Sequence, residues 1–554
     1  MNKARSKNRR FTSSVIDEQA LAEVRGVLGD MPRRRDLLIE YLHGIQDHYK
    51  CISRRHIRAL AAELKLSQTE VYEVATFYHH FDVIDENKEA PPPPITVRVC
   101  ESLTCEMFKS RELIAELEAK FGDGVRVQAV PCVGRCHDAP VAVVGTHPVA
   151  RASAAEVEAA VKEGRLEIPT HEYIDYDQYR KTGGYELLHR CVNGEYRREE
   201  VIKLLQDANL RGLGGAGFPA GKKWAILASK PKPRLIAINI DEGEPGTFKD
   251  RYYLERDPHR FIEGTLIASW AIESEDIYLY LRDEYAGCRR ILEAELEKLR
   301  QDPPCPLPPM HLRRGAGAYI CGEESAMIES IEGKRGMPRL RPPFVADVGI
   351  FGRPTLEQNM ETMHWVRDII EKGPEWFASQ GRHGRKGFRS FSVSGRVNKP
   401  GVHLAPAGIT IRELIDEYCG GMLPGHEFYG YFPGGASGGI LPASLDNIPL
   451  DFDTLQPYGT FIGSAAIIIL SKQDSARALA LNAMAFFREE SCGQCTPCRV
   501  GTEKAMDLMR EEKWDTGLLE ELATAMQDAS ICGLGQAAPN PLRCAIKYFP
   551  EEFS

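Results

Sequence analysis

The sequence predicts a multidomain α/β protein. At 554 residues the chain is too long to bury a single hydrophobic core, and its 43% apolar content is ordinary for a folded protein. Short apolar runs typical of strands alternate with segments of helical periodicity, and proline-rich breaks separate groups of them. We therefore expect several domains joined in series.

The first 90 residues predict a basic tail and a small helical unit. Apolar residues recur at helical spacing between residues 17 and 82, as in Leu21, Val24 and Leu28, and Ser67 opens a capping box with Glu70. Five basic residues lie among the first ten, but the charges that follow exclude the apolar core of an export signal. We expect a frayed basic tail.

Residues 91–170 predict a compact α/β domain of thioredoxin-like size. Four prolines, 91–94, end the helical unit because they cannot donate backbone hydrogen bonds. Alternating strands follow at residues 95–99, 125–130 and 141–145, with helices at 111–120 and 154–162. This β-α-β-β order typically forms one sheet covered by helices.

The rest of the chain predicts three further domains. In residues 175–390 helices alternate with strands at 235–239, 277–281 and 317–321, which predicts the largest α/β domain. Residues 391–473 predict a β-grasp module, with a hairpin turning at 398–401, a helix at 409–415 and a buried strand at 461–470. Residues 474–554 predict a helical bundle.

Four cysteines near the C-terminus predict an iron–sulfur site. Cys492, Cys495 and Cys498 follow the spacing Cys-x2-Cys-x2-Cys, which lets three thiolates close on one face of a [4Fe–4S] cluster, and Cys532 supplies the fourth. Zinc is the alternative, although its sites usually come as two separated pairs of ligands.

A second set of cysteines predicts a [2Fe–2S] site. Cys100 and Cys105 form one pair and Cys132 and Cys136 another, and each pair can bind one iron from a loop that follows a strand. Zinc or plain buried thiols are the alternatives. Fifteen cysteines without a signal peptide indicate a reducing, cytoplasmic location, where thiolates bind metals rather than form disulfides.

A glycine-rich loop at residues 210–219 predicts a cofactor contact. Its Gly-x-Gly-x-x-Gly spacing follows a predicted helix, whereas the ordinary dinucleotide fingerprint follows a strand, and the loop also lacks the pattern of a P-loop. Backbone without side chains lets a flat or phosphorylated cofactor approach, with Phe218 available for stacking and Lys223 for charge. A flexible turn is the alternative.

Two acidic turns follow predicted strands. Asp241, Glu242 and Glu244 come after the strand at 235–239, at the carboxyl edge where open α/β sheets bind ligands. Glu323 and Glu324 follow the predicted strand at 317–321 and open a helix. The alternatives are a solvated acidic loop and carboxylates that merely complement the helix dipole.

Charge and hydropathy exclude two functional classes. The formal net charge of −9 leaves no overall basic field for nucleic acid. The longest apolar stretch, residues 461–470, is about half of what a bilayer-spanning helix needs. We therefore expect neither nucleic-acid binding nor a membrane span.

Taken together, these motifs resemble the NADH-oxidising flavoprotein module of respiratory complex I and its relatives in NAD-reducing hydrogenases and NAD-dependent formate dehydrogenases. Residues 1–165 resemble the small thioredoxin-like [2Fe–2S] subunit, and residues from 175 onward resemble the large subunit that binds FMN and a [4Fe–4S] cluster. The resemblance implies a Rossmann-like FMN domain, the cofactors FMN and NAD, and two subunits fused into one chain.

The resemblance also implies which residues contact FMN and NAD. It places the loop from Gly212 over flavin and nicotinamide, Glu244 at the nucleotide ribose, and Asn359 and Thr362 at the FMN phosphate. Leu213 and Gln358 depart from the family pattern, which usually has arginine and asparagine there. The implied set is Gly212, Gly214, Gly215, Ala216, Gly217, Phe218, Lys223, Asn239, Asp241, Glu242, Glu244, Tyr319, Gly322, Glu323, Glu324, Gln358, Asn359 and Thr362.

Among these relatives, residues 488–504 and 529–541 look most like the β subunit of formate dehydrogenase. The resemblance then implies a diaphorase that receives electrons from a molybdenum or tungsten α subunit with further iron–sulfur clusters and returns them as hydride to NAD+. It implies no catalytic side chain, because FMN transfers the hydride. The alternatives are a diaphorase of an NAD-reducing [NiFe] hydrogenase or of complex I, and a non-enzymatic scaffold with structural zinc.

Overall fold

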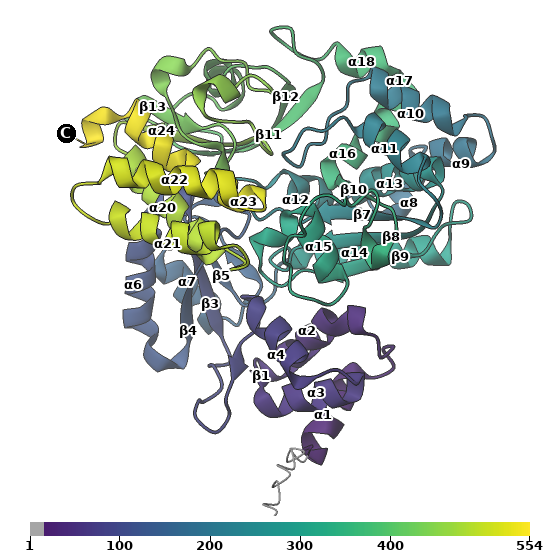
Figure 1. Ribbon diagram of the computed structural model, residues 1–554, viewed down its shortest axis with the longest axis horizontal. Helices are drawn as coiled ribbons and strands as arrows, with labels where there is room; N and C mark the ends of the chain where they lie inside the picture. The colour runs from purple at the N-terminus through teal and green to yellow at the C-terminus, as the bar shows by residue number, and fades with distance from the viewer. Residues whose placement is uncertain (1–15, 554) are drawn as a thin grey trace, which may run out of the picture. The chain divides into compact units, whose positions relative to one another are not determined.

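The computed structural model describes residues 16–553, so the predicted basic tail lies outside the described residues. The chain divides into two compact units, Met1–Pro92 and Pro93–Ser554, with the boundary inside the proline run (Figure 1). Helices and mixed sheets together confirm the predicted multidomain α/β class. No helix in the described part of the chain is long and apolar enough to cross a membrane.

The first unit is helical, as predicted. Its helices are α1 (Glu18–Leu28), α2 (Leu38–Tyr49), α3 (Arg54–Leu64) and α4 (Gln68–Phe77), preceded at α2 by the 3-10 turn η1 (Arg35–Leu37). Ser67 and Glu70 form the predicted capping box of α4. Two parallel strands that the sequence did not reveal, β1 (Ile52–Ser53) and β2 (Val83–Ile84), are too short to show periodicity.

The second unit begins with a four-stranded sheet in the order β4-β3-β5-β6. β3 (Thr96–Cys100) runs parallel to β4 (Arg126–Val130) and antiparallel to β5 (Ala142–Val144), as expected, and β6 (His147–Val149) adds a short hairpin. Beside the sheet lie α5 (Leu103–Met107), α6 (Ser110–Phe121), η2 (Gly122–Gly124), η3 (Cys136–Asp138) and α7 (Ala154–Lys162). The first cysteine pair follows β3 and the second follows β4.

The largest domain contains a fully parallel sheet in the order β10-β7-β8-β9. Its strands are β7 (Arg234–Ile240), β8 (Ser274–Leu281), β9 (Met310–Arg314) and β10 (Thr355–Asn359). Figure 1 shows its helices in blue to teal: α8 (Tyr176–Lys181), α9 (Glu186–Val192), α10 (Arg198–Asp207), α11 (Ala220–Ala228), α12 (Lys249–Leu254), α13 (Pro258–Ile272), α14 (Ala286–Gln301), α15 (Glu324–Ile331), α16 (Met360–His364), α17 (Val366–Lys372) and α18 (Pro374–Ala378).

One predicted strand of this domain is wrong. Residues 317–321 are not a strand; Tyr319–Gly322 form the 3-10 turn η4, and η5 (Ile350–Gly352) is a second such turn. Gly317 has φ +72°, which ends the extended backbone. The backbone N–H of Tyr319 donates to the Glu490 carboxylate at 2.8 Å instead of joining a sheet.

The β-grasp module forms a five-stranded sheet in the order β12-β11-β15-β13-β14. Its strands are β11 (Phe388–Gly395), β12 (Gly401–Pro406), β13 (Phe428–Phe432), β14 (Leu441–Pro442) and β15 (Ala466–Ser471). β11 and β12 form the predicted hairpin, and the predicted helix is α19 (Ile411–Glu413) extended by η6 (Leu414–Tyr418). Residues 436–438, 443–445 and 456–458 form short 3-10 turns.

The strand predicted over residues 461–470 begins only at Ala466. Gly463 has φ +51° and Ala465 has φ +59°, so the backbone turns before β15. Beyond this sheet lie the C-terminal helices α20 (Ala476–Glu489), α21 (Thr496–Met509), α22 (Thr516–Ala529), α23 (Gly533–Ala537) and α24 (Asn540–Tyr548), yellow in Figure 1, followed by η10 (Pro550–Phe553). α20 packs against both α21 and α24.

A buried polar network joins the start of the largest domain to its helices. The Glu295 side chain is fully buried and accepts hydrogen bonds from the Tyr173 hydroxyl (2.7 Å), the Tyr176 N–H (2.8 Å) and the His259 ring (2.9 Å). Burial alone would raise the pKa of Glu295, but the hydrogen bonds from His259, Tyr173 and Tyr176 lower it to about 2. The ionised carboxylate therefore holds the segment before α8 against α13 and α14.

We expect Glu295→Gln to lower the apparent melting temperature by about 5 °C or more at neutral pH, since such a carboxylate contributes about 3 kcal/mol to folding. The folded pKa lies below the ordinary value of 4.5, so this contribution is complete above that pH and is lost as the pH falls towards about 2. Melting curves should show that the difference in apparent melting temperature between the wild type and Glu295→Gln is smaller at about pH 4 than at about pH 7. The exposed Glu297, two residues along α14, provides the control Glu297→Gln; an equal loss there would contradict the assignment.

Candidate functional site

The principal cavity of the second unit, about 290 Å3, lies where the carboxyl ends of β7 and β10 meet the β-grasp module and α23. Asn239 and Asn359 pair in register at the ends of these two strands, so their side chains enter the same edge of the sheet. Eleven of the expected cofactor residues line the cavity: Gly214, Gly215, Ala216, Asn239, Asp241, Glu242, Glu244, Tyr319, Gly322, Glu323 and Asn359.

Seven expected residues lie outside the lining of this cavity. Thr362 is fully buried behind the glycine-rich loop, where its hydroxyl accepts from the Leu213 N–H at 2.9 Å. Gln358 is also buried, and its amide nitrogen has no hydrogen-bond partner among the described residues. The remaining five belong to the loop, to α11 or to the start of α15: Gly212, Gly217, Phe218, Lys223 and Glu324.

The glycine-rich loop follows the helix that the sequence predicted, α10, and leads into α11, so helices flank it on both sides. A hydrogen bond from the Gly212 N–H to the Phe218 carbonyl (2.8 Å) closes it. Gly217 has φ +65°, and a Cβ there would meet the Phe452 ring at 2.5 Å. The Phe218 side chain, 43% exposed, remains available for stacking. The loop therefore has a defined shape and is more than a flexible turn.

Lys223 on α11 joins two carboxylates at the edge of the site. Its Nζ lies 2.7 Å from Glu357 on β10 and 3.7 Å from Glu324 at the start of α15. Burial would lower the pKa of Lys223, but the charges of Glu357 and Glu324 raise it above the ordinary value. The charged lysine links the loop to the sheet rather than pointing into the cavity.

Two carboxylates in the cavity differ in how well their oxygens are satisfied. Asp241 has one buried oxygen that accepts no hydrogen bond within the described residues, and burial raises its pKa well above the usual range. One Glu323 oxygen caps α15, accepting from the N–H groups of Ser325 and Ala326 at 3.0 Å, and the other lies 3.3 Å from the Arg341 guanidinium. The cavity therefore retains a free acceptor at Asp241 for a ligand that donates hydrogen bonds.

Glu242 and Glu244 occupy opposite sides of the same turn. Glu242 accepts from the Asp250 N–H (2.9 Å) and the Tyr285 hydroxyl (2.8 Å), and burial raises its pKa to about 7. Glu244 accepts from the Tyr319 hydroxyl and from the Ser437 N–H, and burial raises its pKa as well. The acidic turn is thus a buried, hydrogen-bonded structure and not a solvated loop.

Sequence reasoning missed a buried lysine in the cavity. Lys249, at the start of α12, is 1% exposed and lies 2.7 Å from Asp250 and 3.1 Å from Glu361. Burial would lower the pKa of Lys249, but these two carboxylates raise it. Asn359 donates to Asp250 at 2.7 Å, next to this lysine. The Lys249-Asp250 pair directly after the acidic turn was the available signal.

The four cysteines of the first domain come together. Cys132 and Cys136 have sulfurs 3.3 Å apart, and hydrogen bonds link Cys100 to both Cys105 and Cys132. All four side chains are buried. Hydrogen bonds from Cys105 and Cys132 raise the pKa of Cys100, whereas those from Cys100 and Cys136 lower the pKa of Cys132. Four convergent thiols from two loops fit the ligand set of a [2Fe–2S] cluster.

Two arginines that the sequence did not single out hold the second cysteine loop. Arg282, after β8, donates to the Cys132 carbonyl at 2.7 Å, and Arg251 on α12 donates to the Gly134 carbonyl at 3.1 Å. Gly134 has φ +70°, and a Cβ there would meet the Tyr285 hydroxyl at 2.4 Å. The largest domain thus fixes the backbone of this cysteine loop.

The C-terminal cysteines also form one cluster. Cys495 immediately precedes α21, Cys498 lies in its first turn, and Cys532 immediately precedes α23. Burial raises the pKa of Cys532, and the charges of Cys492 and Cys498 raise it further, so the three sulfurs are near neighbours. A Cβ at Gly535 would meet Cys498 at 2.8 Å, which shows how tightly α23 covers α21. This set fits a [4Fe–4S] cluster.

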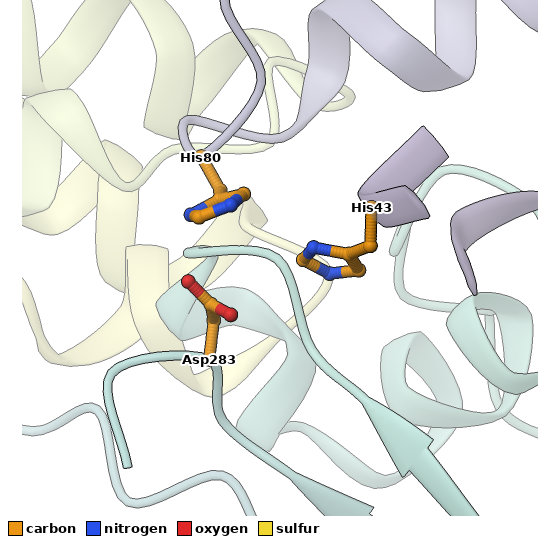
Figure 2. Close-up of side chains that lie close together, drawn as sticks. All are labelled: His43, His80 and Asp283. Carbon is orange, nitrogen blue, oxygen red and sulfur yellow. The ribbon is translucent and has the colours of Figure 1, made fainter. Parts of the chain in front are cut away.

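The helical first unit contains a pair of histidines. His43 on α2 and His80 after α4 have ring centroids 4.9 Å apart, and both appear in Figure 2. Asp283, drawn with them, belongs to the second unit. Two imidazoles fall short of the four ligands of a structural zinc site, so the pair alone does not support a zinc scaffold.

Family models match four segments of the chain. A thioredoxin-like [2Fe–2S] ferredoxin matches residues 24–165, and the Nuo51 FMN-binding domain matches residues 205–368. An SLBB domain matches residues 390–441, and the NADH-ubiquinone oxidoreductase-F iron–sulfur binding region matches residues 478–554. The matched segments include both cysteine sets and all of the principal cavity's lining except Phe461, Gly463 and Ser464.

Individual relatives agree with these models. An NADH-quinone oxidoreductase subunit of Rhizobium meliloti is 40% identical over 390 residues, covering 68% of this chain and 92% of that protein. Mitochondrial NADH dehydrogenase [ubiquinone] flavoprotein 1 of Dictyostelium discoideum is 40% identical over 64% of this chain and 78% of its own length. A solved NAD+-reducing [NiFe]-hydrogenase, in its H2-reduced state, superimposes with a TM-score of 0.83 at 30% identity, covering 94% of this chain and 93% of that one.

The matches cover the thioredoxin-like [2Fe–2S] part of the chain and then its FMN and [4Fe–4S] part, in the order that the motifs predicted. They support FMN, a [2Fe–2S] cluster and a [4Fe–4S] cluster as its cofactors, with NAD as substrate. The chain belongs to the family of NADH-oxidising flavoprotein subunits of complex I type, here joined to a thioredoxin-like [2Fe–2S] ferredoxin.

Proposed function

We propose that this chain is the diaphorase subunit of an NAD-dependent formate dehydrogenase. The observation that carries the diaphorase assignment is the cavity at the carboxyl ends of β7 and β10, which combines an unpartnered oxygen of Asp241 with a glycine-rich loop. The two four-cysteine sets lie in the same unit. The choice of formate depends on residues 488–504 and 529–541, whose sequence is most like that of the formate dehydrogenase β subunit.

Bound FMN would supply the chemistry that exchanges a hydride with NAD(H) and single electrons with iron–sulfur clusters. Lys249 and Asn359 would hold the FMN phosphate, because they place a buried cation and an amide at one edge of the cavity. Asp241 and Glu323 would accept hydrogen bonds from the flavin, and for Asp241 such a bond satisfies a buried oxygen that has no other partner among the described residues.

The nucleotide would bind across the glycine-rich loop. Gly214, Gly215 and Ala216 line the cavity with little side-chain bulk, so a flat ring can lie against their backbone. Glu244 would accept from the ribose hydroxyls, and the exposed Phe218 ring would stack on the adenine. These carboxylates position the reactants; hydride transfer itself needs no proton relay at that atom.

Each cysteine set would hold one cluster. Cys100, Cys105, Cys132 and Cys136 would bind the [2Fe–2S] cluster, with Arg282 and Arg251 fixing the loop that carries the second pair. The [4Fe–4S] cluster would be bound by Cys492, Cys495, Cys498 and Cys532. Glu490 links this second set to the cavity, because its carboxylate accepts from the Tyr319 N–H at 2.8 Å.

A second candidate partner is a [NiFe] hydrogenase. The likeness to the NAD+-reducing hydrogenase covers 94% of this chain, which favours that assembly on grounds of architecture. A diaphorase serves either partner with the same cavity and clusters, so its own geometry does not separate them. The difference lies in the metal of the partner subunit.

We expect the native protein to co-purify with a subunit that contains molybdenum or tungsten, and the complex to reduce NAD+ with formate. Metal analysis of the purified complex, together with NAD+ reduction assays using formate and hydrogen, measures this. Nickel in the complex and activity with hydrogen alone would instead assign the hydrogenase role. A colourless chain that contains zinc and no flavin would refute the diaphorase itself.

We expect Cys495→Ser to remove the EPR signal of one reduced cluster while leaving NADH-to-ferricyanide activity within about twofold of the wild type, because hydride still reaches FMN. The matched control is Cys305→Ser, which changes a half-buried cysteine outside both sets and should keep every signal. Loss of ferricyanide activity in a folded Cys495→Ser protein that retains FMN would contradict the proposed order of electron transfer.

We expect Gly217→Ala to raise the KM for NADH by about tenfold, since the new Cβ would clash with Phe452 in a backbone conformation that disfavours side chains. Gly425→Ala is the control, because Gly425 has φ +78° with open space around it and lies outside the loop. Steady-state kinetics on FMN-loaded protein measure both. Equal KM values for Gly217→Ala and the wild type would show that the loop does not contact the nucleotide.

A further inference from the structure

A second cavity, of about 220 Å3, lies behind the glycine-rich loop, between the loop and the β-grasp module. It shares no residue with the lining of the principal cavity. Four basic residues line it, against a single carboxylate, that of Asp451; they are Arg211, Arg385, Lys386 and Arg389. The cavity therefore carries an excess of positive charge.

Arg389 at the start of the β-grasp sheet is the deepest of these cations. It is 3% exposed, and one of its terminal nitrogens donates to Asp451 at 2.7 Å. Its Nε–H is buried and has no hydrogen-bond partner among residues 16–553. Burial lowers the pKa of Arg389, and Asp451 offsets only part of that effect. A buried donor without an acceptor is costly, so the Arg389 Nε–H can bind a second anion in addition to Asp451.

The other charges do not supply that anion. Asp451 is shared, because its second oxygen accepts from the Arg385 Nε at 2.7 Å. Arg211 is paired outside the cavity with Asp453, whose side chain is 64% exposed. Lys386 is exposed and makes no ion pair with a described residue. One buried carboxylate thus faces two guanidinium groups and a lysine.

We propose that this cavity binds a small organic phosphate. Planar guanidinium groups bind phosphate oxygens through paired hydrogen bonds, and a lysine at the mouth adds charge. The volume exceeds that of a phosphate alone, and three of the remaining lining residues are aromatic: Phe377, Phe388 and Phe452. These rings suit the organic part of such a ligand, since binding sites combine apolar walls with a few placed polar groups.

The cavity is mechanically joined to the glycine-rich loop. Arg211 donates from its Nε to the Gly217 carbonyl and lies 4.5 Å from the centre of the Phe452 ring. Phe452 in turn fills the space that a Gly217 side chain would need. A phosphate that attracts Arg211 would weaken the hydrogen bond that Arg211 donates to the Gly217 carbonyl. We infer that the bound phosphate changes the affinity for NADH; this second step depends on the proposed role of the loop.

The test is calorimetric titration of the FMN-loaded chain, saturated with NAD+ and in chloride-free buffer, with phenyl phosphate and with inorganic phosphate as probes. We expect one site per chain and tighter binding of phenyl phosphate. Arg385→Gln and Lys386→Ala should each weaken binding about tenfold or more. Lys386 is exposed, so its variant keeps the fold even if Arg385→Gln does not.

Matched controls lie in the same domain. Arg412→Gln removes an arginine that pairs with Asp446 at 2.8 Å, and Lys472→Ala removes a lysine that pairs with Glu427; both lie outside the cavity and should bind the probes normally. The proposed phosphate site would be contradicted if the wild type bound neither probe, or if Lys386→Ala and the wild type bound phenyl phosphate with equal affinity.

The coupling has a separate readout. At constant ionic strength, saturating phenyl phosphate should change the KM for NADH by about fivefold or more, and Lys386→Ala should need more of the probe for the same change. Binding without any change in KM would overturn the coupling and leave the site standing. A chain that binds the probe but oxidises no NADH would refute the proposed diaphorase, independently of the phosphate site.

Discussion

The parallel pairing of β7 with β10 is the interaction on which the rest of the site depends. It sets Asn239 opposite Asn359, and the turns that follow these strands carry the acidic residues and the start of α16. A register slip of one residue would turn every side chain of the slipped strand to the other face of the sheet. The cavity, the glycine-rich loop held by Thr362, and the buried lysine all take their positions from this one register.

The cavity contains buried charged groups, and their burial costs folding free energy. Lys249 is held between Asp250 and Glu361 with almost no exposure, and buried ion pairs of this kind seldom stabilise a fold relative to apolar packing. Asp241 adds a buried oxygen that no described residue satisfies. Such groups are retained where a ligand completes them, so bound cofactor stabilises the folded chain by mass action.

Local patterns predicted most of the fold and both cysteine sets. Strands β7 and β8 and helix α7 formed where periodicity placed them, and Ser67 capped α4. Periodicity failed where a distant contact decided the conformation. Residues 317–321 carry the alternation of a strand, but Glu490, more than 160 residues away, takes the Tyr319 N–H. Local sequence contains no sign of that hydrogen bond.

The site was predicted in the same uneven way. Glycines and carboxylates in turns indicate a ligand-binding edge, and seven such residues are among the eleven expected residues that line the cavity. The sequence did not single out three basic residues, Lys249, Arg251 and Arg282, because a basic residue at the end of a helix or strand usually faces solvent. Their function follows from burial and partners, which only the tertiary structure supplies.

Polar contacts join the ferredoxin domain to its neighbours in addition to the apolar cluster of Cys132, Cys136 and Phe248. Arg282 and Arg251 of the largest domain bind carbonyls of the second cysteine loop. Arg396 of the β-grasp module donates to the Met107 carbonyl at 2.6 Å, and Asn482 on α20 donates to the Glu101 carbonyl at 2.8 Å.

Side chains from three domains therefore donate hydrogen bonds to backbone carbonyls near the cysteines of the ferredoxin domain. Hydrogen bonds from charged donors to carbonyls are directional, so they fix the two cysteine loops more strictly than apolar packing of the same area would. Covalent linkage keeps the effective concentration of the ferredoxin domain high, which lets these few polar contacts suffice.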